Sequence, residues 1–366
     1  MASNGKGSPA PGRNGSPTLL LPPANGRHTP ERPRIVVIGG GSGSSVALRG
    51  LKAHPCALTA VVTMFDSGGS SGLLRHEFGY PAFGDLRQCL ATLSEESEPC
   101  ATLQSLLQFR FCEDSSLHGH NLGNLLLAGL TSLSTVEEAI AKLAAVLRIR
   151  GHVVPVSLEQ ADLCAELEDG RVLVGESAID LRRSSSPRIG RVFLEPVADA
   201  SPSAIRAILL ADAVILGPGD LYTSILPNLL VRGIPEALAQ TRAIRIYVCN
   251  LMTKRGETDG FLASDFVSEV NRYLGPAPLD WVIVNNAPVP QRVLDEYARA
   301  GGRPVSPDLH RFSERGLKHF SGPLADGQIP LRHLSDRLAE TILSLVHIRG
   351  SWITAKQPTL KSSWAV

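Results

Sequence analysis

Three glycine-rich segments of this sequence could each bind a phosphate group. The first, GGGSG at residues 39–43, lies between an apolar run at 34–38 and a helical pattern at 45–53. Glycines let the backbone approach a phosphate closely, and the N–H groups at a helix N-terminus favour an anion. The segment lacks the third glycine of the dinucleotide fingerprint and the Gly-Lys-Ser/Thr of a P-loop. It predicts phosphate or nucleotide binding, and a tight strand-to-helix turn is the alternative.

Two acids could hold a cation or a sugar near such a phosphate. Asp66 follows the apolar run at 58–64 and opens the second glycine-rich loop, DSGGSSG at 66–72. An acid at the end of a strand can accept ribose hydroxyls or bind Mg²⁺, although a solvated loop acid shows the same pattern. Asp85 opens GDLRQCL and is either a helix N-cap or a carboxylate that faces a cation. Asp66 and Asp85 are the candidate Mg²⁺ ligands, and they are candidates for catalysis without being assigned to it.

The third glycine segment, GPGDLYTS at 217–224, adds hydroxyl side chains. It could form another wall for a phosphorylated ligand, or a turn in which Thr223 or Ser224 caps the next helix. Asn121 and Asn124 share a helix face at spacing i, i+3 and could hydrogen-bond a base or a sugar. No Ser-His-Asp or Cys-His arrangement and no GxSxG elbow is present, so a hydrolase has no support.

Buried strands must position these loops. Apolar runs rich in Val and Ile alternate with helical patterns, which predicts a parallel sheet covered on both faces. We therefore expect an α/β fold with a Rossmann-like, doubly wound, mostly parallel sheet. Ligands of such sheets lie beyond the carboxyl ends of the strands, where all three glycine segments fall. The predicted strands are residues 34–40, 58–64, 211–217, 243–250 and 280–286.

The middle of the chain has a different pattern. Alternating runs around Asp169-Gly170 predict a hairpin, and we expect a small antiparallel β insertion over residues 152–197. Ser134 and Glu137 have the spacing of a capping box at the start of a helix. The predicted helices are residues 45–53, 85–94, 101–109, 121–133, 134–147, 227–238, 264–274 and 331–346.

Composition limits the class of protein. The 36 basic and 35 acidic residues leave a net charge of +1, which excludes the strongly basic surface of a nucleic-acid-binding protein. No run approaches about 18 apolar residues, so no membrane span is expected. The six cysteines form no CxxC pair and are expected to be buried free thiols. These features predict a cytoplasmic protein.

The two ends of the chain differ from its centre. Residues 1–32 are rich in Gly, Ser, Pro and Asn and are expected to be disordered. Residues 33–350 are expected to form the Rossmann-like domain, followed by a C-terminal tail at 351–366. The apolar helices would suit a homodimer, which is a general expectation for such folds.

The order of the motifs resembles a known family. VVIGGGSG, DSGGSSGLLR, GDLRQCL, GHNLGNLLLAGL, ADAVILGPGDLYTSILPNLL and YVCNLMTKRGETDGFLASDFV occur in this order. Together they resemble the YvcK family of gluconeogenesis factors, which is related to the CofD phospholactate transferases. The resemblance covers residues 33–345.

The resemblance implies a nucleotide-sugar ligand such as UDP-N-acetylglucosamine. It also implies a role in cell shape and wall-precursor supply during gluconeogenic growth, with protein partners in cell-wall synthesis. A late motif, LRHLSDRLA, makes Arg332 and Tyr297 candidates near the sugar or the diphosphate. The full set of candidate ligand-binding residues is Gly40, Gly41, Ser42, Gly43, Asp66, Gly68, Gly69, Ser70, Ser71, Asp85, Arg87, Asn121, Asn124, Gly217, Gly219, Tyr222, Thr223, Ser224, Asn228, Asn250, Tyr297 and Arg332.

One departure from the family pattern bears on the metal. The usual pair of acids before the glycines is Asp66-Ser67 in this sequence. One carboxylate and one hydroxyl bind Mg²⁺ less well than two carboxylates. This departure favours a ligand-binding protein without catalysis over the alternative, a CofD-like Mg²⁺-dependent transferase acting on a nucleoside-diphosphate-activated phospholactate-type donor.

Overall fold

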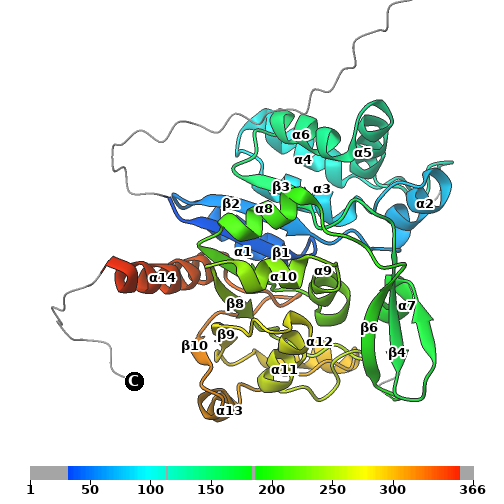
Figure 1. The fold of residues 1–366 in the computed structure, drawn as a ribbon. Helices are drawn as coiled ribbons and strands as arrows, with labels where there is room; N and C mark the ends of the chain where they lie inside the picture. The colour runs from blue at the N-terminus through cyan, green and yellow to red at the C-terminus, as the bar shows by residue number, and fades with distance from the viewer. Residues whose placement is uncertain (1–31, 113, 184–185, 355–366) are drawn as a thin grey trace, which may run out of the picture. The chain divides into compact units, whose positions relative to one another are not determined.

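Seven parallel strands form the central sheet of the protein, whose arrangement can be followed in Figure 1. The computed structural model describes residues 32–112, 114–183 and 186–354. Across the sheet the strands follow the order β10-β9-β8-β7-β1-β2-β3. Their bounds are β1 (Arg34–Gly39), β2 (Ala57–Val62), β3 (His152–Pro155), β7 (Ala213–Leu216), β8 (Ile244–Val248), β9 (Trp281–Asn285) and β10 (Lys318–Gly322).

Helices cover both faces of this sheet, which is why its strands are continuously apolar. Every residue of β7 is buried, as are the last five residues of β1. One layer contains α1 (Ser44–Leu51), α3 (Gly84–Leu93) and α14 (Ser335–Thr354), and α3 packs against β2 and β3. The other layer contains α8 (Pro202–Leu210) and α10 (Ile234–Gln240), and α8 packs against β1 and β3 (Figure 1). The predicted doubly wound α/β fold is confirmed.

The remaining helices flank these layers. A group of helices packs beside α3 and comprises α4 (Glu98–Gln108), α5 (Leu122–Leu133) and α6 (Val136–Val146). The others are α2 (Gly69–Phe78), α9 (Leu226–Leu229), α11 (Ala263–Leu274), α12 (Gln291–Arg299) and α13 (Leu309–Glu314).

A three-stranded antiparallel sheet forms the insertion. Its strands β4 (Asp162–Leu167), β5 (Val172–Val174) and β6 (Ile189–Glu195) have the order β5-β4-β6, with the short helix α7 (Glu176–Asp180) after β5. The predicted hairpin is present, and Gly170 in its turn has a φ of 83°. The predicted start of the insertion at residue 152 is wrong, because β3 pairs in parallel with β2 as the edge of the central sheet.

Several predicted helix boundaries are also wrong. The capping box of α6 is made by Thr135 and Glu138, one residue later than predicted. The predicted helix at 227–238 is divided into α9 and α10, because Gly233 has a φ of 100°. The predicted helix at 331–346 begins only at Ser335. The glycine loop at 66–72 is shorter than predicted, since α2 already begins at Gly69.

Three further predictions concern the ends of the chain, membrane-spanning helices and the cysteines. The predicted disorder of residues 1–32 falls almost wholly outside the described residues, as does most of the tail at 351–366. Within the described part of the chain, no helix combines the length and apolar character needed to cross a membrane. All six cysteines are free, but Cys112 is exposed and Cys56 is partly exposed, so the expectation of burial is wrong for Cys112.

Candidate functional site

A cleft lies at the carboxyl ends of β1 and β7, the two neighbouring strands from which the sheet is wound in opposite directions. The loops after two such strands diverge, and this is where doubly wound sheets bind ligands. The cleft has a volume of about 620 Å³. Seven of the predicted ligand-binding residues line it, namely Ser42, Gly43, Gly219, Ser224, Asn250, Tyr297 and Arg332.

Close backbone contact joins the loops after β1 and β7. A β-carbon on Gly43 would lie 2.3 Å from the Pro218 carbonyl oxygen and 2.6 Å from the Gly219 α-carbon. A β-carbon on Gly40 would lie 2.8 Å from Asp85 Oδ2 and 2.9 Å from Ser224 Oγ. These contacts explain why glycines occupy the turn, and they bring the N-terminus of α1 to the cleft.

Asparagine side chains hold the loop after β7 in place. Asn250 Nδ2 donates to the Gly219 carbonyl at 2.8 Å, and Asn250 Oδ1 accepts from the Tyr247 hydroxyl at 3.0 Å. Asn228 is fully buried and donates to the Ser224 carbonyl at 2.8 Å. Asn250 and Asn228 therefore shape the cleft by fixing its backbone.

Tyr297 and Arg332 both line the cleft. The Tyr297 hydroxyl accepts a hydrogen bond from the Leu331 backbone N–H at 3.0 Å, which fixes the ring beside the loop that carries Arg332. The Arg332 side chain is exposed, and its backbone N–H donates to Asp326 Oδ1 at 3.1 Å. That Tyr297 and Arg332 lie near a sugar or a diphosphate stays a prediction.

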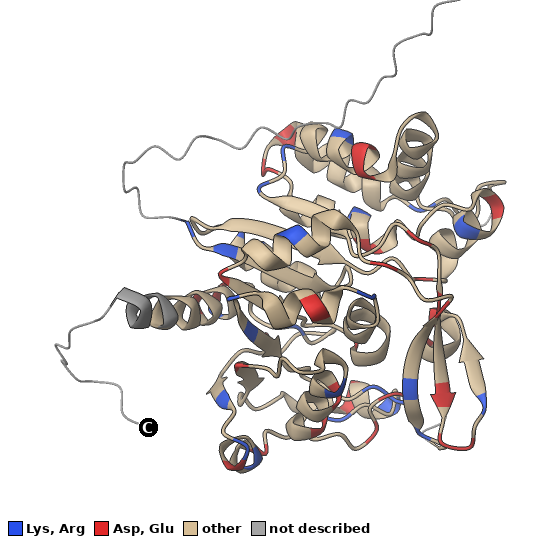
Figure 2. Ribbon diagram, viewed as in Figure 1, with Lys and Arg blue, Asp and Glu red and all other residues tan. Residues whose placement is uncertain are grey.

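Basic residues that the sequence patterns did not single out also line the cleft. Arg183, Lys254, Arg255 and Arg299 join Arg332 there, and Asp220 is the acid among the lining residues. The insertion supplies Arg183, and Figure 2 shows that its strands carry both basic and acidic residues. Lys254 and Arg255 lie inside the motif YVCNLMTKRGETDG, and this motif is the sequence feature by which they could have been identified as candidates.

Lys254 lies among three carboxylates. Its Nζ is 2.8 Å from Asp220 Oδ2 and 2.8 Å from Glu257 Oε1, and it also donates to Asp180. Burial by itself lowers the pKa of Lys254, but these carboxylates together raise it above its usual value. Burial raises the pKa of Glu257 to about 8, against the opposing effect of Lys254.

Asp66 and Asp85 form a second acidic group, outside the lining of the cleft. Burial raises the pKa of Asp85 to about 7, and the Asp66 carboxylate adds to the rise. Burial and the Asp66 carboxylate likewise raise the pKa of Glu176, at the start of α7, to about 8. Asp66 Oδ1 accepts from the Gly68 N–H at 2.7 Å. Asp85 lies in the first turn of α3 and is not its N-cap, which is Phe83.

The first turn of α2 makes internal contacts. Ser70 Oγ accepts from the Asn121 N–H at 3.1 Å, and Ser71 Oγ accepts from the Gly84 N–H at 3.2 Å. Both serines are buried. Ser70 and Ser71 thus connect neighbouring loops. The predicted residues of this segment, Gly68, Gly69, Ser70 and Ser71, do not line the cleft, so their ligand role stays a prediction.

Further predicted residues also have partners within the protein. Arg87 Nε donates to Asn124 Oδ1 at 3.0 Å, and Asn121 caps α5 by accepting from two backbone N–H groups. Tyr222 and Thr223 are buried in a π-helical turn. None of these residues lines the cleft, as is also true of Gly40, Gly41, Gly217 and Asn228, so their ligand role stays a prediction.

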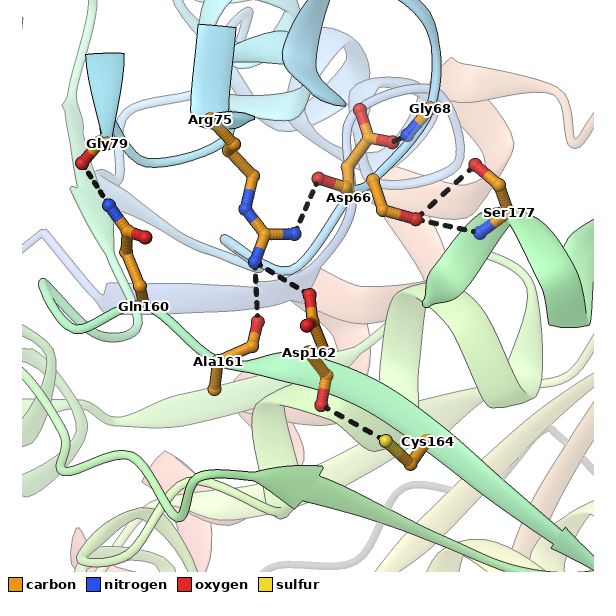
Figure 3. A network of polar contacts seen from close by, with 10 residues as sticks. Asp66, Gly68, Arg75, Gly79, Gln160, Ala161, Asp162, Cys164 and Ser177 are labelled. Atoms are coloured by element: carbon orange, nitrogen blue, oxygen red, sulfur yellow. Dashed lines mark hydrogen bonds and ion pairs between the residues drawn. The ribbon is translucent and has the colours of Figure 1, made fainter. Parts of the chain in front are cut away.

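Arg75 connects this region to the insertion (Figure 3). Its guanidinium donates to the Asp66 carbonyl at 3.3 Å and to the Ala161 carbonyl at 2.9 Å. It also forms an ion pair with Asp162 at 3.0 Å. The next residue, Ser67, accepts a hydrogen bond at its Oγ from the Ser177 N–H at 3.1 Å. Arg75 and Ser67 thus attach the insertion to the loop after β2.

The Mg²⁺ that a CofD-like transferase would use meets one carboxylate fewer here than the family pattern provides, because Ser67 follows Asp66. Among the described residues, no group of three or more His, Cys, Asp or Glu side chains is placed to hold a metal ion. Ser67 contacts Ser177 at the position of the second acid.

The fold is that of an α/β protein whose sheet has a cleft at its switch point. The sequence matches the family model described as 2-phospho-L-lactate transferase CofD over residues 35–325, and the chain belongs to this family. The resemblance predicted from the motifs is therefore confirmed.

Two relatives named gluconeogenesis factor match over almost their whole length. The gluconeogenesis factor of Halalkalibacterium halodurans is 43% identical over 317 residues, which is 86% of this chain and 96% of the relative. The gluconeogenesis factor of Bacillus subtilis is 40% identical, over 86% of this chain and 99% of the relative. A crystal structure of a UPF0052 family member from Bacillus halodurans has a TM-score of 0.81 and 42% identity, and covers 86% of this chain and 99% of that one.

Proposed function

We propose that the protein is a gluconeogenesis factor whose cleft binds a nucleoside-diphosphate sugar such as UDP-N-acetylglucosamine. The observation that carries this proposal is the charge of the cleft. Arg183, Arg255 and Arg332 line it and form no salt bridge with any residue that the structure describes. Guanidinium groups without an acidic partner favour phosphate oxygens, which they can bind through two parallel hydrogen bonds.

Other parts of the cleft suit the same ligand. The N-terminus of α1 enters it at Ser42 and Gly43, where backbone N–H groups favour an anion. Tyr297 offers an aromatic ring with a fixed hydroxyl beside Arg332, which suits contact with a base or a sugar. The volume of about 620 Å³ is within the usual range for a small-molecule site.

In this proposal the protein senses the ligand and does not convert it. Bound nucleotide sugar would report on wall-precursor supply during gluconeogenic growth, and protein partners in cell-wall synthesis would receive the signal. The proposal is supported by relatives named gluconeogenesis factor.

The match to the CofD family favours a second candidate, a transferase acting on a nucleoside-diphosphate-activated donor. In that function Asp66 or Asp85 would act at the reacting phosphate. The lost second acid, with Ser67 after Asp66, counts against it.

Isothermal titration of the purified protein with UDP-N-acetylglucosamine and with GDP distinguishes the two. Saturable binding of the uridine ligand, with no product formed on incubation, supports the sensor. Binding of GDP alone, or turnover that is lost in Asp66→Asn, supports the transferase and contradicts the sensor.

A further inference from the structure

His333 carries a buried hydrogen-bonding atom that no described residue satisfies. The residue lies between β10 and α14, lines the cleft and is 6% exposed. Its Nε2 atom is buried and has no hydrogen-bond partner among the described residues. The other described residues that carry such an atom do not line the cleft. Unpaired buried polar atoms are uncommon in proteins, so this one calls for an explanation.

The surroundings of the His333 ring determine what Nε2 can do. Burial lowers the pKa of His333 to about 4, against the opposing effect of a hydrogen bond with the Cys249 backbone, so the ring is neutral at neutral pH. Because that bond favours the protonated ring, the Cys249 carbonyl is its acceptor. Since Nε2 has no partner, the other ring nitrogen, Nδ1, donates this bond and carries the hydrogen. Nε2 is then a hydrogen-bond acceptor.

The wall of the cleft around His333 is apolar and aromatic. Leu331 lies two residues before His333, and Leu251 lies two residues after Cys249. Leu331 and Leu251 belong to one small apolar cluster, against which Tyr297 packs. All three residues line the cleft. Such a wall with one acceptor suits a planar base, because the ring can pack on apolar side chains while its edge donates to the acceptor.

We propose that His333 Nε2 recognises the base of the ligand by accepting a hydrogen bond from a ring N–H. In the ligand of the proposed function, on which this inference rests, the donor is the N3–H of uracil. Cytosine would turn the lone pair of its N3 toward the lone pair of Nε2, which disfavours that base. Because Nε2 is buried in the structure, neighbouring side chains must shift when the base enters.

Isothermal titration with UDP-N-acetylglucosamine and with its analogue methylated at uracil N3 tests this recognition. The wild-type protein is expected to bind the unmodified ligand about tenfold or more tightly than the analogue, because the methyl group removes the donor and leaves Nε2 unpaired. Equal affinities would overturn the inference while leaving the proposed function intact. If the wild-type protein binds neither compound, the proposed function fails, and this inference fails with it.

His333→Asn tests the histidine itself. The shorter amide keeps a donor for the Cys249 carbonyl near the position of Nδ1 and lacks an acceptor at the position of Nε2. The variant is expected to bind UDP-N-acetylglucosamine about tenfold more weakly than the wild-type protein and to prefer it over the methylated analogue by less than about twofold. His333→Gln returns an amide to the position of Nε2 and is expected to recover part of the affinity and of the preference. Unchanged affinity and preference in folded His333→Asn would overturn the inference.

His310→Asn is the matched control. His310 is exposed on α13 and does not line the cleft. The affinity of this variant and its preference between the two compounds are expected to equal those of the wild-type protein. A loss as large as that in His333→Asn would show that the effect does not depend on the cleft, and would overturn the inference.

Nitrogen NMR of the imidazole rings tests the wild-type protein without any substitution. In the free protein, Nδ1 of His333 is expected to carry the hydrogen and Nε2 to be bare. UDP-N-acetylglucosamine is expected to shift the Nε2 resonance as that atom accepts a hydrogen bond, and to leave the hydrogen on Nδ1. A hydrogen on Nε2 in the free protein, or an Nε2 resonance that stays in place at saturation with the ligand, would overturn the inference. This measurement also decides the case if His333→Asn does not fold.

Discussion

Gly43 and Pro218 hold the two sides of the cleft in backbone contact. A β-carbon at Gly43 would stand 2.3 Å from the Pro218 carbonyl oxygen, closer than any real contact. Gly43 follows β1 and Pro218 follows β7, two strands that are adjacent in the sheet but distant in the chain. The glycine therefore sets how closely the two cleft loops approach.

Gly43→Ala is expected to weaken both stability and ligand binding. The added methyl group meets backbone that cannot rotate away, and such overpacking costs about 1–3 kcal/mol. Gly129→Ala is the control, because no atom lies within 4 Å of the position that its methyl group would take on α5. That substitution is expected to raise stability by about 0.4–1 kcal/mol. Urea unfolding of both variants provides the comparison, and equal effects would contradict the packing argument.

Arg332→Ala is expected to weaken binding of UDP-N-acetylglucosamine without loss of stability. A hydrogen bond to a charged group is worth about 1.5–3 kcal/mol, or about a 10- to 100-fold change in affinity. Arg242→Ala, at an arginine outside the cleft, is expected to change affinity by less than about twofold. Isothermal titration measures both. Unchanged affinity in Arg332→Ala would place the ligand elsewhere.

Asp85→Asn is expected to stabilise the protein more as pH rises from about 4 to about 7. The carboxyl group has a pKa of about 7 in the folded state, against an ordinary value of 3.8. Below pH 3.8 neither state is ionised, so no cost arises. Above about pH 7 both states are ionised, and the folded state bears the full cost of a buried charge. The difference between the folded and ordinary pKa values of Asp85 corresponds to about 4 kcal/mol at most in the free energy of unfolding.

The measurement for Asp85→Asn is urea unfolding at several pH values. The difference between the variant and the wild-type protein should grow with pH up to about 7 and then level off. A difference that is constant across this range would show that Asp85 is not the group that titrates.

Arg75→Met is expected to destabilise the attachment of the insertion. The side chain is 12% exposed and gives hydrogen bonds to Asp66, Ala161 and Asp162. Its loss leaves two carbonyl groups without this donor, at a cost of about 2 kcal/mol. Asp162→Asn removes only the ion pair, whose carboxylate is 48% exposed, and should cost less than about 1 kcal/mol. Hydrogen exchange of β4 is expected to speed up in Arg75→Met and to change little in Asp162→Asn.

The sheet and the position of the cleft could be predicted from local patterns. Strands buried on both faces must be continuous apolar runs, so β1, β2, β7, β8 and β9 were recognisable. Glycine segments follow β1 and β7, and doubly wound sheets bind ligands beyond the carboxyl ends of such strands, so these segments indicated the position of the cleft. The strand β3 was misplaced because its four residues show no feature that separates an edge strand of one sheet from the start of another.

The polar partners of the site could not be predicted, because they come from distant segments. Lys254 contacts Asp180 and Asp220, which lie 74 and 34 residues away from it in the sequence. The sequence predicts that Asn124 lines the cleft, but its side-chain oxygen accepts a hydrogen bond from Arg87 in the protein. Glycine and serine have low helix propensity, so the sequence does not predict that α2 begins at Gly69. In the protein, tertiary contacts of Ser70 and Ser71 override this low propensity.

A crystal structure of the complex with UDP-N-acetylglucosamine, grown without divalent metal, tests the proposed binding site most directly. We predict diphosphate oxygens within hydrogen-bonding distance of Arg255 or Arg332, with the base or sugar beside Tyr297. A diphosphate held at Asp66 and Asp85, away from these arginines, would contradict the proposal.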